Sequence, residues 1–248
     1  ESFKILMETP LEVIGLSKIY DKKKAVKDIS FKVNKNEIIG ILGPNGCGKT
    51  TTIGMILGLL KPTSGKVLIN GIEIEKKRVE LLNNLNFISP YIELPKKLTV
   101  KQNLIVYGKL YDVKNLTSKI EYLSEKLRLE EIINKITGEL SSGQKNRVSL
   151  AKSIINDPLV LLLDEPTASL DPETGDFVRS FLEDYQKERG TSILLASHNM
   201  SEVERLCSSV LMMNSGSIID QGSTEELINK HGRKNMEEVF LKLTRETI

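Results

Sequence analysis

A glycine-rich stretch between a predicted strand and a predicted helix constrains this chain more than any other feature. Residues 43–50 read Gly-Pro-Asn-Gly-Cys-Gly-Lys-Thr and fit the pattern G-x-x-x-x-G-K-[ST]. The apolar residues 38–42 before it predict a buried strand, and residues 50–59 after it predict a helix. Glycines let the backbone turn several N–H groups toward one anion, and the new helix directs its positive end to the same place. The stretch therefore predicts a loop that binds the phosphates of a nucleoside triphosphate.

Three side chains of this loop carry further expectations. Lys49 supplies an ammonium group for the outer phosphates, and the Thr50 hydroxyl can coordinate Mg²⁺. The alternative, an ordinary glycine-rich turn, does not require this pair of residues. Cys47 lies at the start of the same helix beside Lys49, which predicts a reactive thiol that a bound nucleoside triphosphate protects from alkylation.

Composition excludes several classes of protein. The chain has 248 residues, of which 40% are hydrophobic, enough for one large domain or two small ones with a real core. A net charge of +2 is too small to indicate a nucleic-acid partner. Its two cysteines give no disulfide framework or metal-binding spacing, which favours a reducing compartment. No apolar run approaches the roughly 20 residues of a membrane span, and residues 3–7 are too short for a signal peptide. A role at a membrane would therefore require a partner that supplies the spans.

The first third of the chain combines antiparallel strands with the phosphate-binding unit. Alternating apolar and polar residues predict a half-buried strand at residues 29–33. Asn70-Gly71, between two short apolar runs, predicts a hairpin with a type I′ turn. Further strands are expected at residues 11–16 and 86–89.

Between Pro90 and Pro158 the pattern becomes helical. Ser118 and Glu121 have the spacing of a capping box at the start of a helix. Three helices are expected here, at residues 98–111, 118–129 and 142–155. This block predicts an all-helical insert within an α/β core.

The last third returns to an α/β pattern. Asp171-Pro172 predicts the start of a helix, and Ser201 with Glu204 predicts the cap of another. The other expected elements are strands at residues 159–163 and 193–196, a hairpin at residues 210–219, a short helix, and a charged tail at residues 232–248.

Acidic residues and an imidazole follow two of the apolar strands. Asp164 and Glu165 come directly after the first strand, and His198 comes shortly after the second. Ligands bind at the carboxyl ends of strands in open α/β sheets. Asp164 therefore suits a Mg²⁺ contact, and Glu165 is placed to orient or deprotonate an attacking water. His198 could donate a hydrogen bond to the γ-phosphate, although its spacing alone favours an ordinary histidine at a strand end.

A second anion site is predicted at residues 140–144, Leu-Ser-Ser-Gly-Gln. These residues begin a helix, so Ser141 and the N–H groups after it can hold an anion. The segment lies in the helical insert, remote from Lys49. As an isolated motif it would be an ordinary serine-capped helix, but together with the first loop it suggests that one chain completes the active site of another.

Taken together, these motifs resemble the ATP-binding subunits of ABC transporters over essentially the whole chain. Residues 43–50 resemble the Walker A motif, and residues 160–165 resemble Walker B with its catalytic glutamate. Residues 140–144 resemble the LSGGQ signature, with Ser142 replacing the first glycine, and residues 169–171 resemble the D-loop. His198 resembles the switch histidine, and Tyr20 resembles the aromatic residue that stacks on adenine. From spacing alone, Tyr20 would be assigned to the core.

The resemblance implies a P-loop NTPase (RecA-like) core at residues 1–89 and 158–231, with an antiparallel β subdomain, an inserted all-helical subdomain at residues 90–157 and a tail at residues 232–248. It implies Glu165 and His198 as catalytic residues, and Thr50 and Asp164 as metal contacts. The residues implied to bind ATP are Tyr20, Gly43, Pro44, Asn45, Gly46, Cys47, Gly48, Lys49, Thr50, Thr51, Ser141, Gly143, Gln144 and Asp171.

In this family two subunits bind head to tail, with each ATP between Walker A of one copy and the signature of the other. The resemblance thus implies a homodimer or a heterodimer with a second ATPase subunit, in which Ser141, Gly143 and Gln144 act across the interface and Asp171 links the two sites. It also implies membrane-spanning permease partners and a peripheral position on the cytoplasmic face of the membrane. The end of the chain, residues 236–241, resembles exporter-type subunits.

One departure concerns the glutamine that the family usually has after the strand entering the helical insert. There it contacts Mg²⁺ and water and couples ATP to the permease. Residues 87–91 here read Phe-Ile-Ser-Pro-Tyr, so Ser89 or Pro90 takes its position. Ser89 would offer a shorter oxygen ligand, whereas Pro90 offers no polar side-chain atom. Because Glu165 and His198 are present, hydrolysis is still expected.

Two other functions compete with a transporter engine. A soluble ABC-type ATPase serving macromolecular assembly has the same motifs, although a single phosphate loop disfavours tandem translation factors. The stretch between Lys49 and Asp164 leaves no room for the long coiled coils of DNA-repair relatives. A nucleotide-gated binding module with little turnover is the other alternative, because the glutamine is missing.

Overall fold

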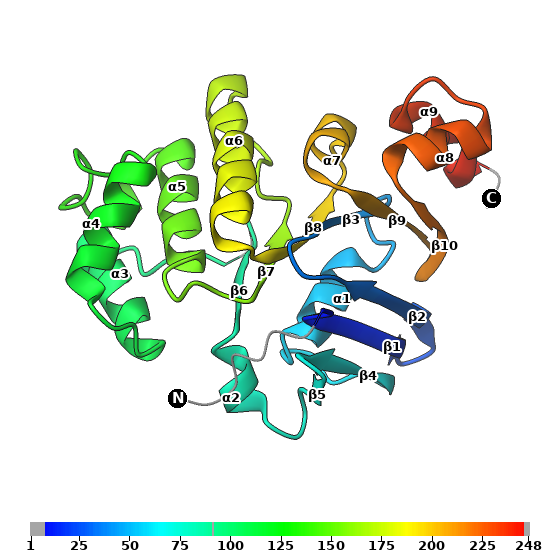
Figure 1. Ribbon diagram of the computed structural model, residues 1–248, viewed down its shortest axis with the longest axis horizontal. Coiled ribbons are helices and arrows are strands. Elements are labelled where there is room, and N and C mark those ends of the chain that lie inside the picture. Colours follow the sequence, from blue (N-terminus) through cyan, green and yellow to red (C-terminus); the bar gives the residue numbers. More distant parts are fainter. Residues whose placement is uncertain (1–7, 91, 246–248) are drawn as a thin grey trace.

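The structure is a computed structural model that describes residues 8–90 and 92–245. Residues 3–7, considered above as a leader, and Tyr91 lie outside the described residues. Two β-sheets and a set of helices make up the molecule, with the helical insert at one end and the carboxyl-terminal helices at the other (Figure 1). In the part of the chain that the structure describes, none of the helices combines the length and the apolar character of a membrane span.

A six-stranded, mostly parallel sheet forms the centre of the molecule. All residues of β3, β7 and β8 are buried, as expected for parallel strands covered on both faces. Only β10, at one edge, is antiparallel to its neighbour. The strand order is β10 (Ser217–Gly222), β9 (Ser209–Asn214), β3 (Ile38–Leu42), β8 (Ser192–Ser197), β7 (Val160–Asp164) and β6 (Leu85–Ile88).

The register of the central strands brings their carboxyl ends together. Leu42 at the end of β3 pairs with Ser197 of β8, and Asp164 at the end of β7 pairs with Ala196 of β8. The segments that follow β3, β7 and β8 therefore leave the sheet side by side. This edge is where ligands bind in open α/β sheets.

A four-stranded antiparallel sheet lies against the core unit. Its strands, in order, are β2 (Lys23–Val33), β1 (Leu11–Tyr20), β4 (Ser64–Ile69) and β5 (Ile72–Glu73). The Asn70-Gly71 hairpin is confirmed: both residues have positive φ, 48° and 75°, as a type I′ turn requires.

Strand β1 is longer than predicted. It continues to Tyr20 through several register shifts, one of them between Val13 and Leu16 and another between Leu16 and Lys18. Gly15 adopts a left-handed conformation within it, with φ of 58°. Bulges interrupt the two-residue alternation that predicts a strand, which is why the pattern was lost after Leu16.

The helical insert lies between β6 and β7. It consists of α3 (Val100–Leu110), α4 (Leu116–Lys126), a 3₁₀ turn (Thr137–Glu139) and α5 (Ser142–Ser153). The fold class is confirmed by this arrangement of a P-loop core, an antiparallel sheet and a helical insert.

The capping box predicted at Ser118 is wrong. Helix α4 begins after Asn115, which is left-handed and has no side-chain cap, so Ser118 lies within the first turn. Packing decides this start, because the Leu116 side chain fills the space that Gly108 of α3 leaves open. A capping box is present instead at Thr99, where the side chains of Thr99 and Gln102 each bond the backbone N–H of the other.

A buried lysine joins the insert to the sheet. Lys152 of α5 donates from Nζ to Oδ1 of Asn86 at 3.1 Å and to the carbonyl oxygen of Phe87 at 3.3 Å. The ammonium also lies 4.6 Å from the ring centroid of Phe87 and 5.3 Å from that of Tyr107. Burial lowers the pKa of Lys152 to about 8. Helix α5 is thereby fixed to the end of β6, where the chain enters the insert.

The remaining helices are α1 (Lys49–Ile56), α2 (Arg78–Leu82), α6 (Pro172–Arg189), α7 (Met200–Leu206), α8 (Thr224–His231) and α9 (Met236–Arg245). The predicted start of α6 is confirmed, since Asp171 Oδ1 accepts from the N–H of Thr174 at 2.9 Å. The cap predicted for α7 at Ser201 is wrong. Asn199 caps this helix and accepts from the N–H of Glu202 at 3.3 Å.

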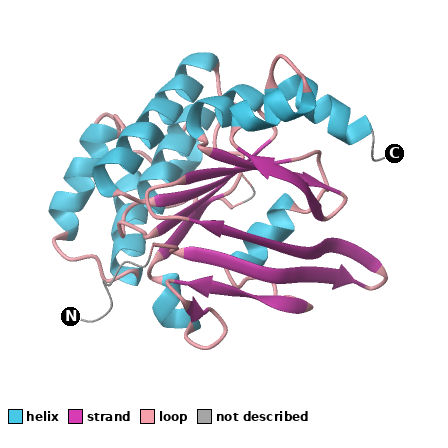
Figure 2. Ribbon diagram, turned by 45° about the vertical axis from the view of Figure 1, so that its right-hand side comes forward, coloured by secondary structure: helices cyan, strands magenta, loops and turns pink. Residues whose placement is uncertain are grey.

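Two hydrophobic cores cover the two faces of the central sheet. Leu161 and Leu163 of β7 pack into the core that includes α5, α6, α7 and the insert. Val160 and Leu162 of the same strand face the core that includes α1 and the antiparallel sheet. Figure 2 shows helices over one face of the central sheet and the antiparallel sheet beyond the other. Strand β3, which leads into the phosphate loop, is thus packed on both faces, with Leu42 in the first core and Ile41 in the second.

The predicted charged tail contains a packed helix. Met236 and Val239 of α9 are completely buried, in the same core as α7 and α8. The N–H of Met236 donates to Oε1 of Glu204 in α7 at 2.9 Å. The charged residues between these apolar positions occupy the exposed face of the helix. Because they are numerous, the composition of this segment suggested a charged tail and not a packed helix.

Replacing Met236 by alanine should lower the free energy of unfolding by about 2–4 kcal/mol, because the substitution leaves a cavity in the core. Urea denaturation followed by circular dichroism measures this change. The matched control is Glu237→Ala, on the exposed face of the same helix, which should stay within about 0.5 kcal/mol of the parent. Equal midpoints for the two variants would show that α9 does not contribute to the core.

Candidate active site

The phosphate loop connects β3 to α1 with a backbone that only glycine accommodates. Gly46 and Gly48 have φ of 78° and 114°, and Gly48 is the left-handed cap of α1. At Gly43 a Cβ would collide with the carbonyl oxygen of Met213 and with Sγ of Cys47. The loop therefore presents its N–H groups and the start of α1 to one small volume.

Lys49 lies at the base of this loop with only 6% of its surface exposed. Its ammonium donates to the carbonyl oxygen of Gly43 at 2.6 Å and to that of Pro44 at 3.4 Å. No acidic side chain of the described residues forms an ion pair with it. A phosphate group entering the cleft would supply the negative charge.

Thr50 and Asp164 supply oxygen atoms suited to a divalent cation. The Thr50 hydroxyl donates to Oδ2 of Asp164 at 3.1 Å across the cleft. Burial raises the pKa of Asp164, and the Thr50 hydrogen bond opposes this effect. No cluster of three or more His, Cys, Asp or Glu side chains occurs among the described residues. This donor set fits Mg²⁺, which is commonly held by one or two protein oxygens together with phosphates and water.

Glu165 and His198 meet at the same edge of the sheet. Nδ1 of His198 lies 2.7 Å from Oε2 of Glu165, and the His198 side chain is 60% exposed. Glu165 adopts a left-handed conformation with φ of 52°, and its N–H donates to the carbonyl oxygen of Ala196 at 2.8 Å. Such a conformation costs about 1–3 kcal/mol in a residue other than glycine. The carboxylate is thus held beside the cleft, in contact with the imidazole.

A cleft of about 540 Å³ is bordered by these elements. The predicted site residues that line it are Asn45, Gly46, Gly48, Lys49, Thr50, Thr51, Asp164, Glu165 and His198. Ala25, Pro90, Ala168 and Ser169 also line it. Gly43, Pro44 and Cys47 belong to the loop but lie behind this lining.

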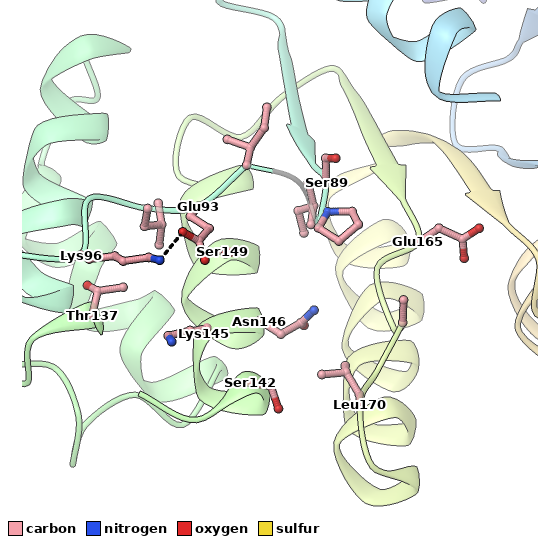
Figure 3. A pocket seen from close by; sticks show the side chains of 15 residues that line it. Ser89, Glu93, Lys96, Thr137, Ser142, Lys145, Asn146, Ser149, Glu165 and Leu170 are labelled. Carbon is pink, nitrogen blue, oxygen red and sulfur yellow. Dashed lines mark ion pairs between the residues drawn. The ribbon is translucent and has the colours of Figure 1, made fainter. Parts of the chain in front are cut away.

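Of the two residues that could stand where the family has a glutamine, only Pro90 lines this cleft. Pro90 lines the cleft beside Asp164 and Glu165, whereas Ser89 lines only the adjacent pocket. That pocket, of about 220 Å³, lies between the entry to the insert and α5 (Figure 3). Of this pair, the residue that borders the cleft therefore has no polar side-chain atom.

The second predicted anion site is not part of this cleft. Ser141 caps α5, and its hydroxyl accepts from the N–H of Gln144 at 3.3 Å. The Gln144 side chain in turn accepts from the N–H of Ser141 at 3.0 Å. None of Ser141, Gly143 and Gln144 lines the cleft at Lys49. Within one chain, the start of α5 is thus separate from the lining of the cleft at Lys49.

Asp171 and Tyr20 also lie outside the lining of the cleft. Asp171 is occupied by its own helix, since Thr174 donates to it from both backbone and hydroxyl; these bonds lower its pKa. Tyr20 ends β1 with 43% of its surface exposed. The Nζ of Lys18 lies 5.1 Å from the Tyr20 ring centroid. Exposure contradicts the assignment of Tyr20 to the core and leaves one ring face available.

The structure argues against the predicted reactivity of Cys47. Its side chain is 3% exposed and belongs to the core on the side of α1. Burial raises the pKa of the thiol, and the nearby Lys49 charge opposes this only in part. Proximity to a helix start and a lysine suggested a thiolate, but the thiol points into the protein.

Sequence analysis missed a buried carboxylate behind the cleft. Glu202 of α7 accepts hydrogen bonds from Thr167 and Ser197, whose segments carry Glu165 and His198. Asn146 of α5 also reaches this region and donates to the carbonyl oxygen of Pro166 at 2.7 Å. In the sequence, Glu202 looks like any other acidic residue of a helix, four residues after His198. No local pattern shows that its side chain is buried.

Comparison with known proteins supports the motifs. The sequence matches the family described as ABC transporter over residues 26–168, more than half of the chain. The chain belongs to the ABC transporter family. It is therefore an ATP-binding subunit with ATP hydrolysis as its activity.

Curated members of the family match most of the chain. The ABC transporter ATP-binding protein NatA of Bacillus subtilis (strain 168) is 35% identical over 227 residues, covering 89% of this chain and 92% of that protein. The Nod factor export ATP-binding protein I of Rhizobium johnstonii is 38% identical over 232 residues, covering 91% and 73%. A solved structure described as an ATP-binding subunit of an ABC transporter aligns with a TM-score of 0.88 at 26% identity, covering 95% of this chain and all of that one.

Both thiols of the native protein should react slowly with a disulfide reagent at pH 8, because each is buried and burial raises the pKa of each. Absorbance at the wavelength of the released thiolate, recorded with and without urea, measures this. Cys47→Ala and Cys207→Ala assign the two signals. Rapid, stoichiometric labelling of Cys47 in the folded protein would contradict the burial described here.

Proposed function

We propose that this chain is the engine of an ABC exporter, acting as a dimer at the cytoplasmic face of a membrane. ATP binding and hydrolysis by the dimer would drive conformational change in membrane-spanning permease subunits. The family membership supports ATP-driven transport. The direction, the partner and the arrangement of the dimer go beyond that and are argued below.

The main support for the dimer is the separation of the two anion sites. The cleft at Lys49 holds the phosphate loop, the metal contacts and the candidate base. Ser141 and Gly143, at the start of α5, are absent from its lining and lie on a surface of the insert. A nucleotide bound to Lys49 is thus open on one side, where a second copy can offer its own Ser141 and the start of its α5. Asp171, at the start of α6, would lie between the two nucleotides.

In this proposal each residue of the cleft has one task. The loop N–H groups and Lys49 would bind the phosphates, and Thr50 and Asp164 would hold Mg²⁺, which when bound would neutralise charge on the phosphate oxygens. The Glu165 carboxylate would accept a proton from the attacking water. His198, in contact with that carboxylate, donates a hydrogen bond toward the γ-phosphate. Tyr20 would stack on the adenine ring with its exposed face.

Pro90 alters one part of this scheme. The Pro90 side chain has no oxygen atom and would supply no ligand to Mg²⁺, which would be held by Thr50 and Asp164. Contact between the cleft and the permease would then depend on the shape of residues 88–90 and 92–94 instead of on a polar ligand. Three residues of this segment, Ile88, Ile92 and Leu94, line the adjacent pocket as apolar surface.

The export direction rests on the name of one group of relatives: the Rhizobium protein is named as an export subunit. A protein of Bacillus licheniformis that is 34% identical is named for bacitracin transport, which supports transport without giving its direction. The absence of a membrane-spanning helix among the described residues agrees with spans supplied by another subunit. Copurification from detergent extracts with a polytopic membrane protein tests the proposed permease partner.

Replacing Glu165 by glutamine should abolish ATP turnover while leaving ATP binding intact, because the amide cannot accept the proton of the attacking water. ATP should then accumulate between two copies, and size exclusion with multi-angle light scattering should report a dimer in ATP and a monomer without nucleotide. The matched control is Glu173→Gln, the first acidic residue of α6. A Glu165→Gln variant that stays monomeric in saturating ATP would contradict the dimer.

Introducing arginine at Ser141 should abolish hydrolysis and spare ATP binding, because the side chain obstructs only the site of the other copy. Turnover is measured by phosphate release, and binding by fluorescence of a labelled ATP analogue. Ser118→Arg, an exposed position on α4 of the same insert, controls for the added charge and should turn over ATP normally. Loss of nucleotide binding in Ser141→Arg would show that Ser141 serves the nucleotide of its own chain.

A further inference from the structure

Glu202 of α7 is a buried carboxylate with no task in the scheme above. Only 1% of its surface is exposed. An ionised carboxylate in such a place lowers stability unless hydrogen bonds replace its hydration. Each oxygen of the Glu202 carboxylate accepts a hydrogen bond: Oε1 from the Thr167 hydroxyl at 2.8 Å, and Oε2 from the Ser197 hydroxyl at 2.6 Å.

The two hydroxyls belong to the two segments that carry the candidate catalytic residues. Thr167 follows Glu165 by two residues, and Ser197 immediately precedes His198. Ser197 also accepts from the N–H of Asn199 at 3.0 Å, which ties the start of α7 to the same point. One carboxylate therefore bridges the loop after β7 and the end of β8.

The loop after β7 needs such a support. Glu165 and Ser169 both have positive φ, 52° and 62°, conformations that residues other than glycine rarely adopt. Strained backbone of this kind persists only when surrounding contacts fix it. The contacts that hold this loop from outside include the hydrogen bond of Asn146 to Pro166 and that of Glu202 to Thr167.

We propose that Glu202 is a positioning residue for ATP hydrolysis. By holding Thr167 and Ser197 at a fixed separation, its carboxylate keeps Glu165 and His198 at their 2.7 Å contact. This inference rests on the catalytic roles proposed above for Glu165 and His198. A contact behind the reacting groups acts on the rate because small displacements of a base have large effects on turnover.

Arg205, on the same short helix, provides a control for the stability of α7. Its guanidinium donates to Asp176 at 2.6 Å and to Glu183 at 2.9 Å, and so joins α7 to α6 on the exposed side. Loss of these bonds loosens α7 without changing the link from Glu202 to Thr167 and Ser197. Arg205→Ala therefore separates the stability of the helix from the position of Glu165 and His198.

The test compares Glu202→Gln, Thr167→Val, Thr167→Ser and Arg205→Ala as full-length proteins. Thr167→Val removes the hydroxyl at nearly constant shape, and Thr167→Ser retains it. For Glu202→Gln and Thr167→Val we expect kcat to fall about tenfold, part of the roughly 100- to 10,000-fold that a positioned base contributes. The affinity for a fluorescent ATP analogue should stay within twofold of the parent. Thr167→Ser should recover kcat to within about threefold of the parent, and Arg205→Ala should leave kcat unchanged even where its Tm falls.

Several outcomes would overturn the proposal. A normal kcat in both Glu202→Gln and Thr167→Val would do so. An equal loss of kcat in Thr167→Val and Thr167→Ser would also do so. So would a loss of kcat in all variants that is proportional to their loss of Tm. Glu165→Gln is assayed in parallel. Full turnover by Glu165→Gln would refute the assignment of the base itself. An inactive Glu165→Gln beside fully active Glu202 and Thr167 variants would refute only the role of Glu202.

Discussion

The structure depends on a constraint of the central sheet: parallel strands end at a common edge. Strands β3, β8 and β7 are adjacent and fully buried, so the chain must leave all three toward the same side. The phosphate loop, His198 and the pair Asp164-Glu165 follow these strands at once. Residues far apart in sequence thereby come within hydrogen-bonding distance, as the 3.1 Å contact between Thr50 and Asp164 illustrates. Substituting these side chains changes the chemistry at this edge. The sheet itself determines that the side chains meet there.

Around this edge the chain builds supports of two kinds. Glycines at the phosphate loop allow close approach of the backbone, with Gly43 packed against Met213. Behind Glu165 and His198 the supports are polar and come from helices: Glu202 from α7, and Asn146 from α5. Helix α5 begins with Ser141 and is fixed to β6 by Lys152. In the proposed dimer, one helix would therefore touch the nucleotide of the other copy at its start and, through Asn146, the loop that carries the candidate base of its own chain.

Local signals predicted the elements whose conformation depends on a few consecutive residues. The Asn70-Gly71 turn, the Asp171 cap of α6 and the strand–loop–helix unit at residues 38–56 are of this kind, because each is determined by backbone dihedral angles and nearby hydrogen bonds. Prediction failed where packing competes with a local pattern. The start of α4 follows the contact of Leu116 with Gly108 and not the capping pattern at Ser118. Strand β1 continues through bulges, and the charged tail conceals a helix with two buried residues.

Residue identity and spacing alone predicted the phosphate-binding loop, the helical insert within an α/β core, the motifs of the family and the absence of a glutamine before the insert. These are properties of residue identity and spacing, which folding does not change. Only the tertiary structure decided that Pro90 lines the cleft, that the Cys47 thiol points into the core, and that Glu202 joins the segments of Glu165 and His198. The reason is that each of these depends on which side of an element faces which neighbour. That choice is made by packing between segments distant in sequence, and residue spacing along one segment does not encode it.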